Sequence, residues 1–253
     1  SIQSISKIIT LAVALEICGF DQVFKKVGME PTGDPFNSLM KLENTDSSPY
    51  NPMINAGAIV VASCLASEIS FDTMLDTIRA LCMDPDINLD KKVYHSEMSH
   101  ISRNRAIAYL LESKGYIEKN KDVENSLHFY VKMCSLSVTA ESLAGLGLIL
   151  ANDGIHPDTG KRLLSSQAVK IVKTLMFTCG MYDGSGEFAV RVGIPSKSGV
   201  GGGILSVVDG EMGIGIFGPA LDKKGNSVAG ECVLEYMSHE LHLHMFDPQR
   251  HTL

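Results

Sequence analysis

Residues 195–217 read PSKSGVGGGILSVVDGEMGIGIF. Two apolar runs in this stretch, Ile204–Val208 and Met212–Phe217, flank the dipeptide Asp209-Gly210, which suits a tight hairpin turn. We predict that the two runs pair as antiparallel strands. Phe188–Val192 has the same short apolar character and is predicted to be a further strand. The chain then closes with a predicted amphipathic helix over Ser227–Met245, so this part forms an α/β lobe.

The chain before residue 153 is predicted to be mainly helical. Its apolar residues recur at helical spacing, and loops rich in Pro, Gly, Asp and Asn separate the segments. The predicted helices are Ser4–Cys18, Met53–Ala66, Phe71–Met83, Arg103–Leu111, Val123–Cys134 and Thr139–Asn152, and Ser166–Phe177 follows the change of texture. We therefore expect a helical lobe over residues 1–152 and an α/β lobe over residues 153–253. Three strands make a thin sheet, so we expect N-terminal strands to be missing from this chain.

Composition excludes several classes of function. The 253 residues are 45% apolar and carry 22 basic against 29 acidic side chains, and no window collects five basic residues, so we expect no nucleic-acid partner. The longest apolar stretches, such as Ile8–Ala14 and Leu143–Ala151, are too short to span a bilayer, so we expect no membrane partner. Six cysteines are scattered singly, which is typical of reduced thiols and predicts a cytoplasmic location.

A serine and a lysine stand three residues apart in Ser4-Ile5-Ser6-Lys7, at the start of the first predicted helix. On a helix this spacing brings the amine within reach of the hydroxyl. Burial of an apolar helix would lower the pKa of Lys7, so that some neutral amine exists near pH 7 to accept a proton. The same spacing recurs in Ser38-Leu39-Met40-Lys41, but that segment is predicted to be a loop, and we interpret it as incidental.

Lys197-Ser198-Gly199 forms a K-S-G triplet just before a predicted strand. Serine β-lactamases and penicillin-binding proteins carry such a triplet beside their nucleophile. Ser102-Arg103-Asn104 resembles the S-x-N element of the same enzymes. The glycines that follow the triplet leave backbone N–H groups open to a substrate, as an oxyanion site requires.

Two other patterns are interpreted as structural. Residues 213–218 read GIGIFG and match a dinucleotide-binding pattern, but these glycines lie within a predicted strand and Pro219 follows, so we expect no cofactor. His239, His242 and His244 do not have the spacing of the metal-binding H-E-x-x-H motif, so we expect no metal site.

Over essentially its whole length the sequence resembles the serine-dependent, β-lactamase-like glutaminases of the bacterial type. The resemblance rests on QSISK at residues 3–7, NPMINAGAI at 51–59, Ser96-Glu97 with Arg103-Asn104, Phe129-Tyr130, CGMYD at 179–183, PSKSGV at 195–200, and Leu221-Asp222-Lys223 before Gly225-Asn226-Ser227. It implies a β-lactamase/penicillin-binding-protein-like fold, in which a helical lobe accompanies an antiparallel sheet flanked by helices. It also implies hydrolysis of L-glutamine to L-glutamate and ammonia.

The resemblance also implies roles for particular residues. Ser4 would be the nucleophile, Lys7 its base, and Tyr182 a partner in proton transfer to ammonia. Residues matching substrate contacts of the family are Ser4, Asn55, Glu97, Asn104, Tyr130, Tyr182 and Val200. The chemistry agrees, because the α-ammonium of glutamine calls for a carboxylate and its α-carboxylate calls for neutral donors. Two departures are Ser102, where the family has aspartate, and a tyrosine that precedes the serine motif in the family and is not in this chain.

Two other functions remain open at this point. A penicillin-binding protein or β-lactamase would share the S-x-x-K motif at Ser4 and the K-S-G triplet, but it would need no carboxylate to bind an ammonium group. A noncatalytic amino-acid-binding module would keep Glu97 and the asparagines but would have no use for Lys7 beside Ser4. The resemblance further implies a homodimer or homotetramer.

Overall fold

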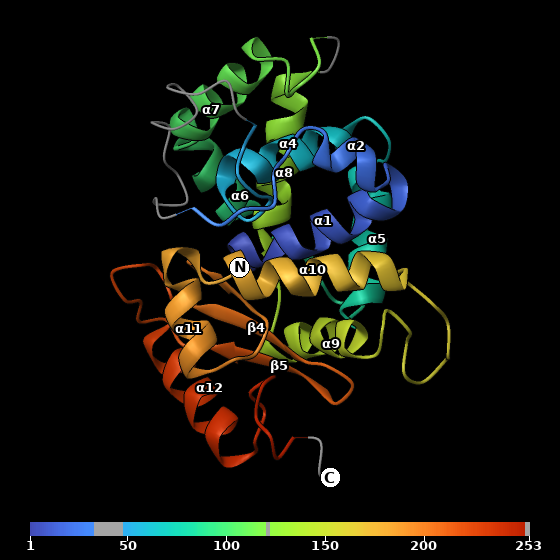
Figure 1. Cartoon of the computed structure of the whole chain (residues 1–253). Helices are drawn as coiled ribbons and strands as arrows, with labels where there is room; N and C mark the ends of the chain where they lie inside the picture. The colour runs from blue at the N-terminus through green and yellow to red at the C-terminus, as the bar shows by residue number, and fades with distance from the viewer. Residues whose placement is uncertain (33–47, 120–121, 251–253) are drawn as a thin grey trace. The chain divides into compact units, whose positions relative to one another are not determined.

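The computed structural model describes residues 1–32, 48–119 and 122–250 (Figure 1). The chain forms two compact units, one made of Ser1–Arg79 with Pro85–Ser137 and the other of Ala80–Asp84 with Val138–Leu253. The boundary therefore differs from the predicted one between residues 152 and 153. The second serine–lysine pair, Ser38 and Lys41, lies outside the described residues.

Helices make up most of the first unit. They are α1 (Ser6–Ile17), α2 (Phe20–Phe24), α4 (Asn55–Ala66), α5 (Phe71–Leu81), α6 (Lys91–Ser99), α7 (Ser102–Ser113) and α8 (Val123–Cys134), with the short 3₁₀ turn η1 (Gln3–Ile5) at the start. Helix α4 is apolar on all sides and buried along almost its whole length, and α1, α7 and α8 pack around it (Figure 1). It is the core of this unit.

No single helix in the described ranges is long and apolar enough to cross a bilayer. Helices α4 and α5, taken together across a bend of 112°, pass the test by length and composition only.

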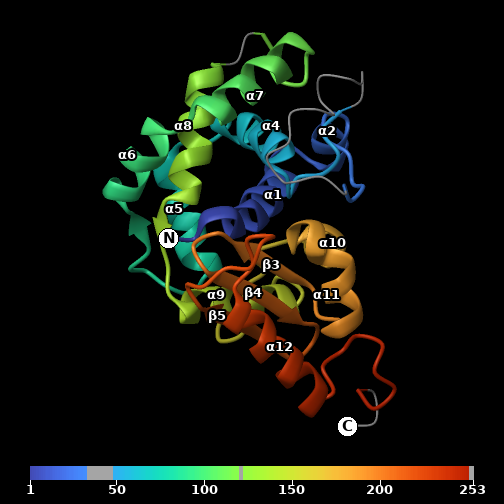
Figure 2. The same ribbon diagram turned by 90° about the vertical axis from the view of Figure 1, so that its left-hand side faces the viewer.

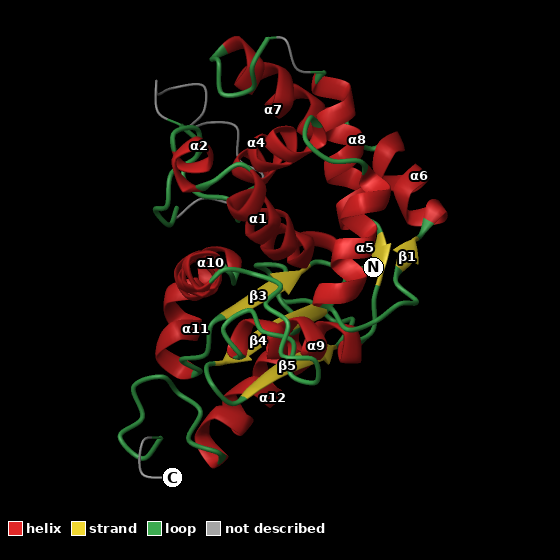
Figure 3. Cartoon of the chain, turned by 90° about the vertical axis from the view of Figure 1, so that its right-hand side faces the viewer, coloured by secondary structure: helices red, strands yellow, loops and turns green. Residues whose placement is uncertain are grey.

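One helix and one strand pair of the first unit have no clear signal in the sequence. β1 (Asn88–Leu89) pairs antiparallel with β2 (Leu136–Ser137), although we predicted no strand there (Figure 3). Asp90 then caps α6 by accepting hydrogen bonds from the backbone N–H groups of Lys92 and Val93. Because no residue of α6 is buried, this helix lacks the apolar periodicity on which the prediction of helices depends.

The sheet of the second unit is antiparallel, with strand order β3-β4-β5 (Figure 2). The strands are β3 (Ser196–Gly199), β4 (Gly203–Val208) and β5 (Met212–Phe217), and Val208 pairs with Met212 across the turn at Asp209-Gly210. The predicted hairpin is therefore confirmed. The K-S-G triplet precedes β4, as we predicted, but it also lies within a strand of its own, β3, whose Ser196 pairs with Ser206 of β4.

The predicted strand at Phe188–Val192 is wrong. These residues lie mainly in helix α11 (Ser185–Arg191), which follows α10 (Ser166–Cys179). Phe188 and Val192 are buried, whereas Val190 between them is 79% exposed. Residues 188, 190 and 192 would share one face of a strand, whereas only residues four apart share one face of a helix, so this burial pattern fits a helix.

Side chains on one face of the sheet form the apolar core of the second unit. Ile204 and Ile214 pack in a buried cluster with Leu234 of α12 (Val228–Glu240), and Phe188 of α11 joins them. The last helix is thus shorter than the predicted Ser227–Met245. Its N-terminus is capped by the side chain of Ser227, which accepts a hydrogen bond from Gly230 N–H.

The other face of the sheet lies against α9 (Ala140–Ala151), and glycines make the close approach possible. A Cβ atom at Gly213 would overlap the Ala144 carbonyl oxygen, and one at Gly215 would overlap the Ala140 carbonyl oxygen. The pattern GIGIFG therefore serves helix–sheet packing. Because α9 packs on this sheet, it belongs to the second unit, although the sequence placed it with the helical lobe.

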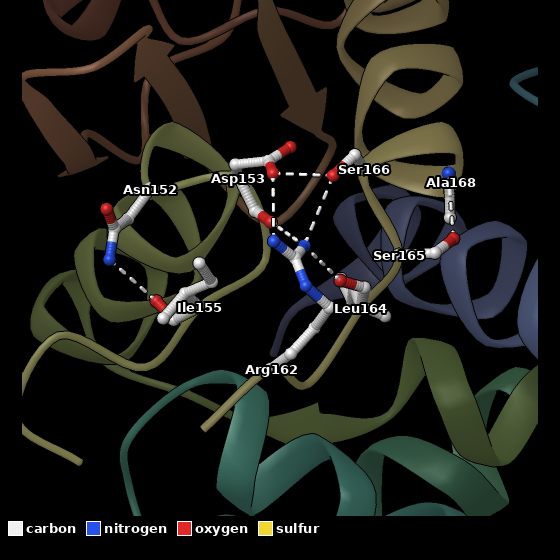
Figure 4. A network of polar contacts seen from close by, with 8 residues as sticks. All are labelled: Asn152, Asp153, Ile155, Arg162, Leu164, Ser165, Ser166 and Ala168. Carbon is white, nitrogen blue, oxygen red and sulfur yellow. Dashed lines mark hydrogen bonds and ion pairs between the residues drawn. The ribbon is translucent and has the colours of Figure 1, made fainter. Parts of the chain in front are cut away.

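A polar network closes the loop between α9 and α10 (Figure 4). The Arg162 guanidinium donates to the Asp153 backbone oxygen at 2.6 Å and to its carboxylate at 3.1 Å. Ser166, the first residue of α10, donates to the same carboxylate at 2.6 Å. The hydrogen bonds that the Asp153 carboxylate accepts from Ser166 and Arg162 hold its pKa below its usual range. The network ties both ends of the loop together at an exposed surface.

The contact between β5 and α9 predicts the effect of a single methyl group. Gly215→Ala should lower the free energy of unfolding by about 3 kcal/mol or more, because backbone atoms of α9 must move away. The matched control is Gly186→Ala in α11, where a Cβ meets no atom within 4 Å. That change should stabilise the protein by roughly 0.5–1 kcal/mol through helix propensity. Chemical denaturation of both variants measures the difference; equal stabilities would contradict this account of the packing.

Candidate active site

Ser4 and Lys7 lie on consecutive helical turns at the beginning of the first unit. Ser4 is in η1 and is 6% exposed, and Lys7 is in the first turn of α1 and is 2% exposed. The predicted helix therefore begins as expected, with both side chains buried. The two residues are three apart, on consecutive turns of the same helical segment.

The Lys7 ammonium donates hydrogen bonds to two neutral oxygen atoms. Its Nζ donates to the Met53 backbone oxygen at 3.0 Å and to Asn55 Oδ1 at 2.8 Å. Burial lowers the pKa of Lys7 to about 8, and the nearby thiol of Cys134 opposes this shift more weakly. Roughly half of the amine is therefore neutral near pH 8 and can accept a proton.

The segment NPMINAG builds the turn that holds Lys7. Asn51 Oδ1 accepts hydrogen bonds from the backbone N–H groups of Met53 and Ile54, at 2.9 and 3.2 Å. This turn presents the Met53 carbonyl to Lys7 and starts α4 at Asn55. Gly57 is required because a Cβ atom there would overlap the Asn51 carbonyl oxygen. The motif is therefore explained by the geometry of the lysine site.

Three of the predicted substrate contacts come together in the first unit, each from a different helix. Tyr130 of α8 donates from its hydroxyl to Asn55 Oδ1 at 3.2 Å. Asn55 of α4 donates from Nδ2 to Asn104 Oδ1, on α7, at 3.1 Å. Because Asn55 also accepts from Lys7, the lysine and these three neutral side chains belong to one hydrogen-bond network.

Glu97 joins the same unit through a residue to which the sequence gave no role. Gln3, directly before Ser4, donates from Nε2 to Glu97 Oε1 at 3.1 Å. Its φ of 49° lies in the left-handed region, which a glutamine seldom adopts. Glu97 itself is exposed on α6. The sequence signal for Gln3 was its place in the QSISK motif, directly before the serine.

The remaining predicted residues, Tyr182 and Val200, lie in the second unit. Both side chains border Gly225: a Cβ there would be 3.4 Å from Val200 Cγ1 and 3.6 Å from Tyr182 Cε2. Lys197, fully buried in β3, places its ammonium 4.4 Å from the centre of the Tyr182 ring. It donates to the backbone oxygens of Gly180 and Ser198, at 3.1 and 2.6 Å. Lys197 was noted only as part of the K-S-G triplet.

In the ranges that the structure describes, no three His, Cys, Asp or Glu side chains are grouped to hold a metal ion. His239 contacts Glu240, and His242 contacts Asp247 at 3.1 Å.

A sequence profile of the glutaminase family matches residues 1–246. The chain belongs to the glutaminase family. It is 54% identical over 250 residues to a glutaminase of Fusobacterium nucleatum, with 97% of this chain and 81% of the relative covered. The identity to a glutaminase of Clostridioides difficile is also 54%, with 97% and 80% covered.

Solved structures place the fold in the same family. A probable glutaminase of Bacillus subtilis superimposes with a TM-score of 0.92 at 40% identity, covering 97% of this chain and 82% of that one. Another structure, of a Bacillus subtilis glutaminase in covalent complex with 5-oxo-L-norleucine formed from 6-diazo-5-oxo-L-norleucine, gives a TM-score of 0.86 at 38% identity, covering 97% and 81%. The fold is thus that of the bacterial glutaminases, which mixes helices with small antiparallel sheets.

The pKa of Lys7 predicts the direction of the pH dependence. The neutral amine is the deprotonated form, so its fraction increases about tenfold per pH unit below the pKa and levels off above it. We expect kcat/KM for glutamine to rise from about pH 6 and to reach a plateau above about 8, where Lys7 titrates. Initial rates of ammonia release across this range test it. A flat profile would show that another group accepts the proton.

Proposed function

We propose that this glutaminase hydrolyses the side-chain amide of L-glutamine through an acyl-enzyme on Ser4. The observation that carries the proposal is the buried Lys7, whose pKa of about 8 leaves part of the amine neutral one helical turn from Ser4. Lys7 takes the Ser4 proton as the oxygen attacks the carboxamide carbon. Ammonia leaves with a proton, and water then hydrolyses the ester to release glutamate.

The polar side chains of the first unit suit a free amino acid. Glu97 supplies a carboxylate for the α-ammonium group, and Gln3 fixes one of its oxygens. Asn55, Asn104 and Tyr130 are neutral hydrogen-bonding groups, which suit an α-carboxylate. A zwitterionic substrate needs both kinds of group, so this set favours glutamine over an amide without an amino group.

Roles for the second unit follow from the match to the family motifs. We propose that Tyr182 passes a proton to the departing ammonia and that the backbone N–H groups of Ser4 and Val200 stabilise the oxyanion. The buried cation of Lys197, 4.4 Å from the centre of the Tyr182 ring, supports a role of this tyrosine in proton transfer.

The penicillin-binding alternative shares the fold that we propose, a β-lactamase/penicillin-binding-protein-like arrangement of a helical lobe and a flanked antiparallel sheet. The serine–lysine pair at a helix start and the K-S-G triplet in a strand support this relationship. Glu97 separates the two functions, because a penicillin-type substrate gives it no ammonium group to bind. Nitrocefin turnover tests that alternative directly.

Assembly and location are also proposed from the resemblance. We propose a homodimer or homotetramer, and the exposed apolar side chains of Val190, Phe217 and Tyr236 are available to an interface between copies. Size-exclusion chromatography with light scattering tests it. The cytoplasmic location expected from the single cysteines stays a prediction.

Replacing the nucleophile should abolish the reaction without unfolding the protein. Ser4→Ala should release ammonia at less than about 1% of the wild-type rate, because the attacking oxygen is lost. It should also fail to form a covalent adduct with 6-diazo-5-oxo-L-norleucine, detected by intact-protein mass spectrometry. Ser70→Ala, which removes an exposed hydroxyl from the same unit, is the control and should react like the wild type. Adduct formation at another residue in Ser4→Ala would overturn the assignment.

Glu97→Gln should report the contact with the substrate's ammonium group. The change keeps the volume of the side chain but removes its charge, so kcat/KM for glutamine should fall roughly thirty- to a hundredfold, or about 2–3 kcal/mol. Glutaramate, which lacks the α-amino group, should be a poor substrate of the wild type and should lose little more in the variant.

The control for this experiment is Glu68→Gln, which removes an exposed carboxylate of the same unit. It should leave both substrates unaffected. Equal losses on glutamine and glutaramate in Glu97→Gln would mean that Glu97 supports the pocket and does not recognise the amino group.

A further inference from the structure

Tyr182 has a backbone conformation that needs support. Its φ is 54°, in the left-handed region that a residue with a large side chain rarely adopts. It forms the first residue of the short 3₁₀ turn η2 (Tyr182–Gly184), between α10 and α11. Strained residues of this kind persist only where neighbouring groups fix them.

One hydroxyl group binds the backbone on both sides of Tyr182. Ser185 Oγ accepts a hydrogen bond from Met181 N–H at 3.0 Å and donates one to the Tyr182 backbone oxygen at 2.8 Å. A serine hydroxyl can act as donor and acceptor at once, and this geometry uses both capacities. Ser185 is 5% exposed, so water competes little for either bond.

Other contacts also fix the same turn, among them a hydrogen bond from the Ser185 backbone N–H to the Tyr182 oxygen. The Met181 backbone oxygen accepts from Gly184 N–H at 3.0 Å and from Asn226 Nδ2 at 3.4 Å. The Lys197 ammonium lies over the ring of Tyr182. The ring of Tyr182 is therefore contacted by Lys197, whereas the Ser185 hydroxyl is the side-chain group that bonds the backbone on both sides of the left-handed residue.

We infer that Ser185 is a positioning residue, which sets the direction of the Tyr182 phenol by holding the backbone of residues 181 and 182 in the left-handed turn. The inference rests on the proposed function, in which Tyr182 transfers a proton. Ser185 touches no reacting atom and acts only through Tyr182. Proton transfer depends steeply on geometry, so even a small rotation of the turn should slow the chemical step more than it weakens binding.

A double-mutant cycle tests the inference with glutamine as substrate. Ser185→Ala should lower kcat by about ten- to a hundredfold and change KM by less than about threefold. In a Tyr182→Phe background, which itself has a low kcat, the same change should lower kcat by less than about threefold, because the phenol it would misplace is already absent. If Ser185→Ala does not fold, Ser185→Cys, a weaker donor and acceptor of similar shape, replaces it in the cycle.

Ser238→Ala is the matched control. Ser238, 3% exposed, also donates its hydroxyl to a backbone oxygen, that of Val192 at 2.6 Å, but does not contact the Tyr182 turn. We expect Ser238→Ala to lower the midpoint of thermal unfolding about as much as Ser185→Ala while leaving kcat unchanged. This comparison separates the loss of a buried hydrogen bond from the loss of positioning.

Three results would overturn the inference, and they differ from failure of the proposed function. Ser185→Ala could keep kcat within about twofold of the wild type, or lower it equally in both backgrounds, which would make its effect independent of Tyr182. Tyr182→Phe could retain full activity, which would leave no catalytic phenol to position. A wild-type protein that releases no ammonia from glutamine would instead refute the proposed function itself.

Discussion

The burial of one amine determines much of the first unit. The Lys7 amine is buried where the Met53 carbonyl and Asn55 Oδ1 accept its hydrogen bonds, which offsets the cost of removing it from water. Those two acceptors are in place because Asn51 folds the preceding turn and Gly57 lets α4 approach it. Burial in turn lowers the pKa of Lys7 into the range in which it can act as a base. Structure and reactivity therefore depend on the same few contacts.

Close approach of backbone to backbone is the second constraint, and it recurs in both units. Gly57 meets the Asn51 carbonyl, and Gly213 and Gly215 meet α9. In each place the missing side chain lets a helix pack directly on a turn or a strand, with backbone atoms of the two elements in contact. The glycine pattern of β5 thus serves packing, although it has the spacing of a nucleotide-binding loop.

Left-handed backbone occurs at two residues next to the proposed chemistry, Gln3 and Tyr182. Each is supported by side-chain hydrogen bonds: Gln3 bonds Glu97 and its carbonyl accepts from the Ser6 hydroxyl, and Tyr182 is held by Ser185. Strain of this kind costs free energy of about 1–3 kcal/mol and is kept where it fixes the direction of a reactive group.

The sequence by itself determined the serine–lysine pair, the long buried helices and the β4–β5 hairpin, because periodicity and turn chemistry are local properties. It also pointed to Asn55, Glu97 and Tyr130 through resemblance to a family. Only the tertiary structure decided that α9 belongs with the sheet, that residues 188–192 lie mainly in a helix, and that α6 exists. These outcomes depend on which face of a segment meets a partner distant in sequence. The same holds for the contacts of Gln3 and Ser185, since a hydrogen bond between residues 3 and 97, or a left-handed turn at residue 182, leaves no periodic signal in the chain.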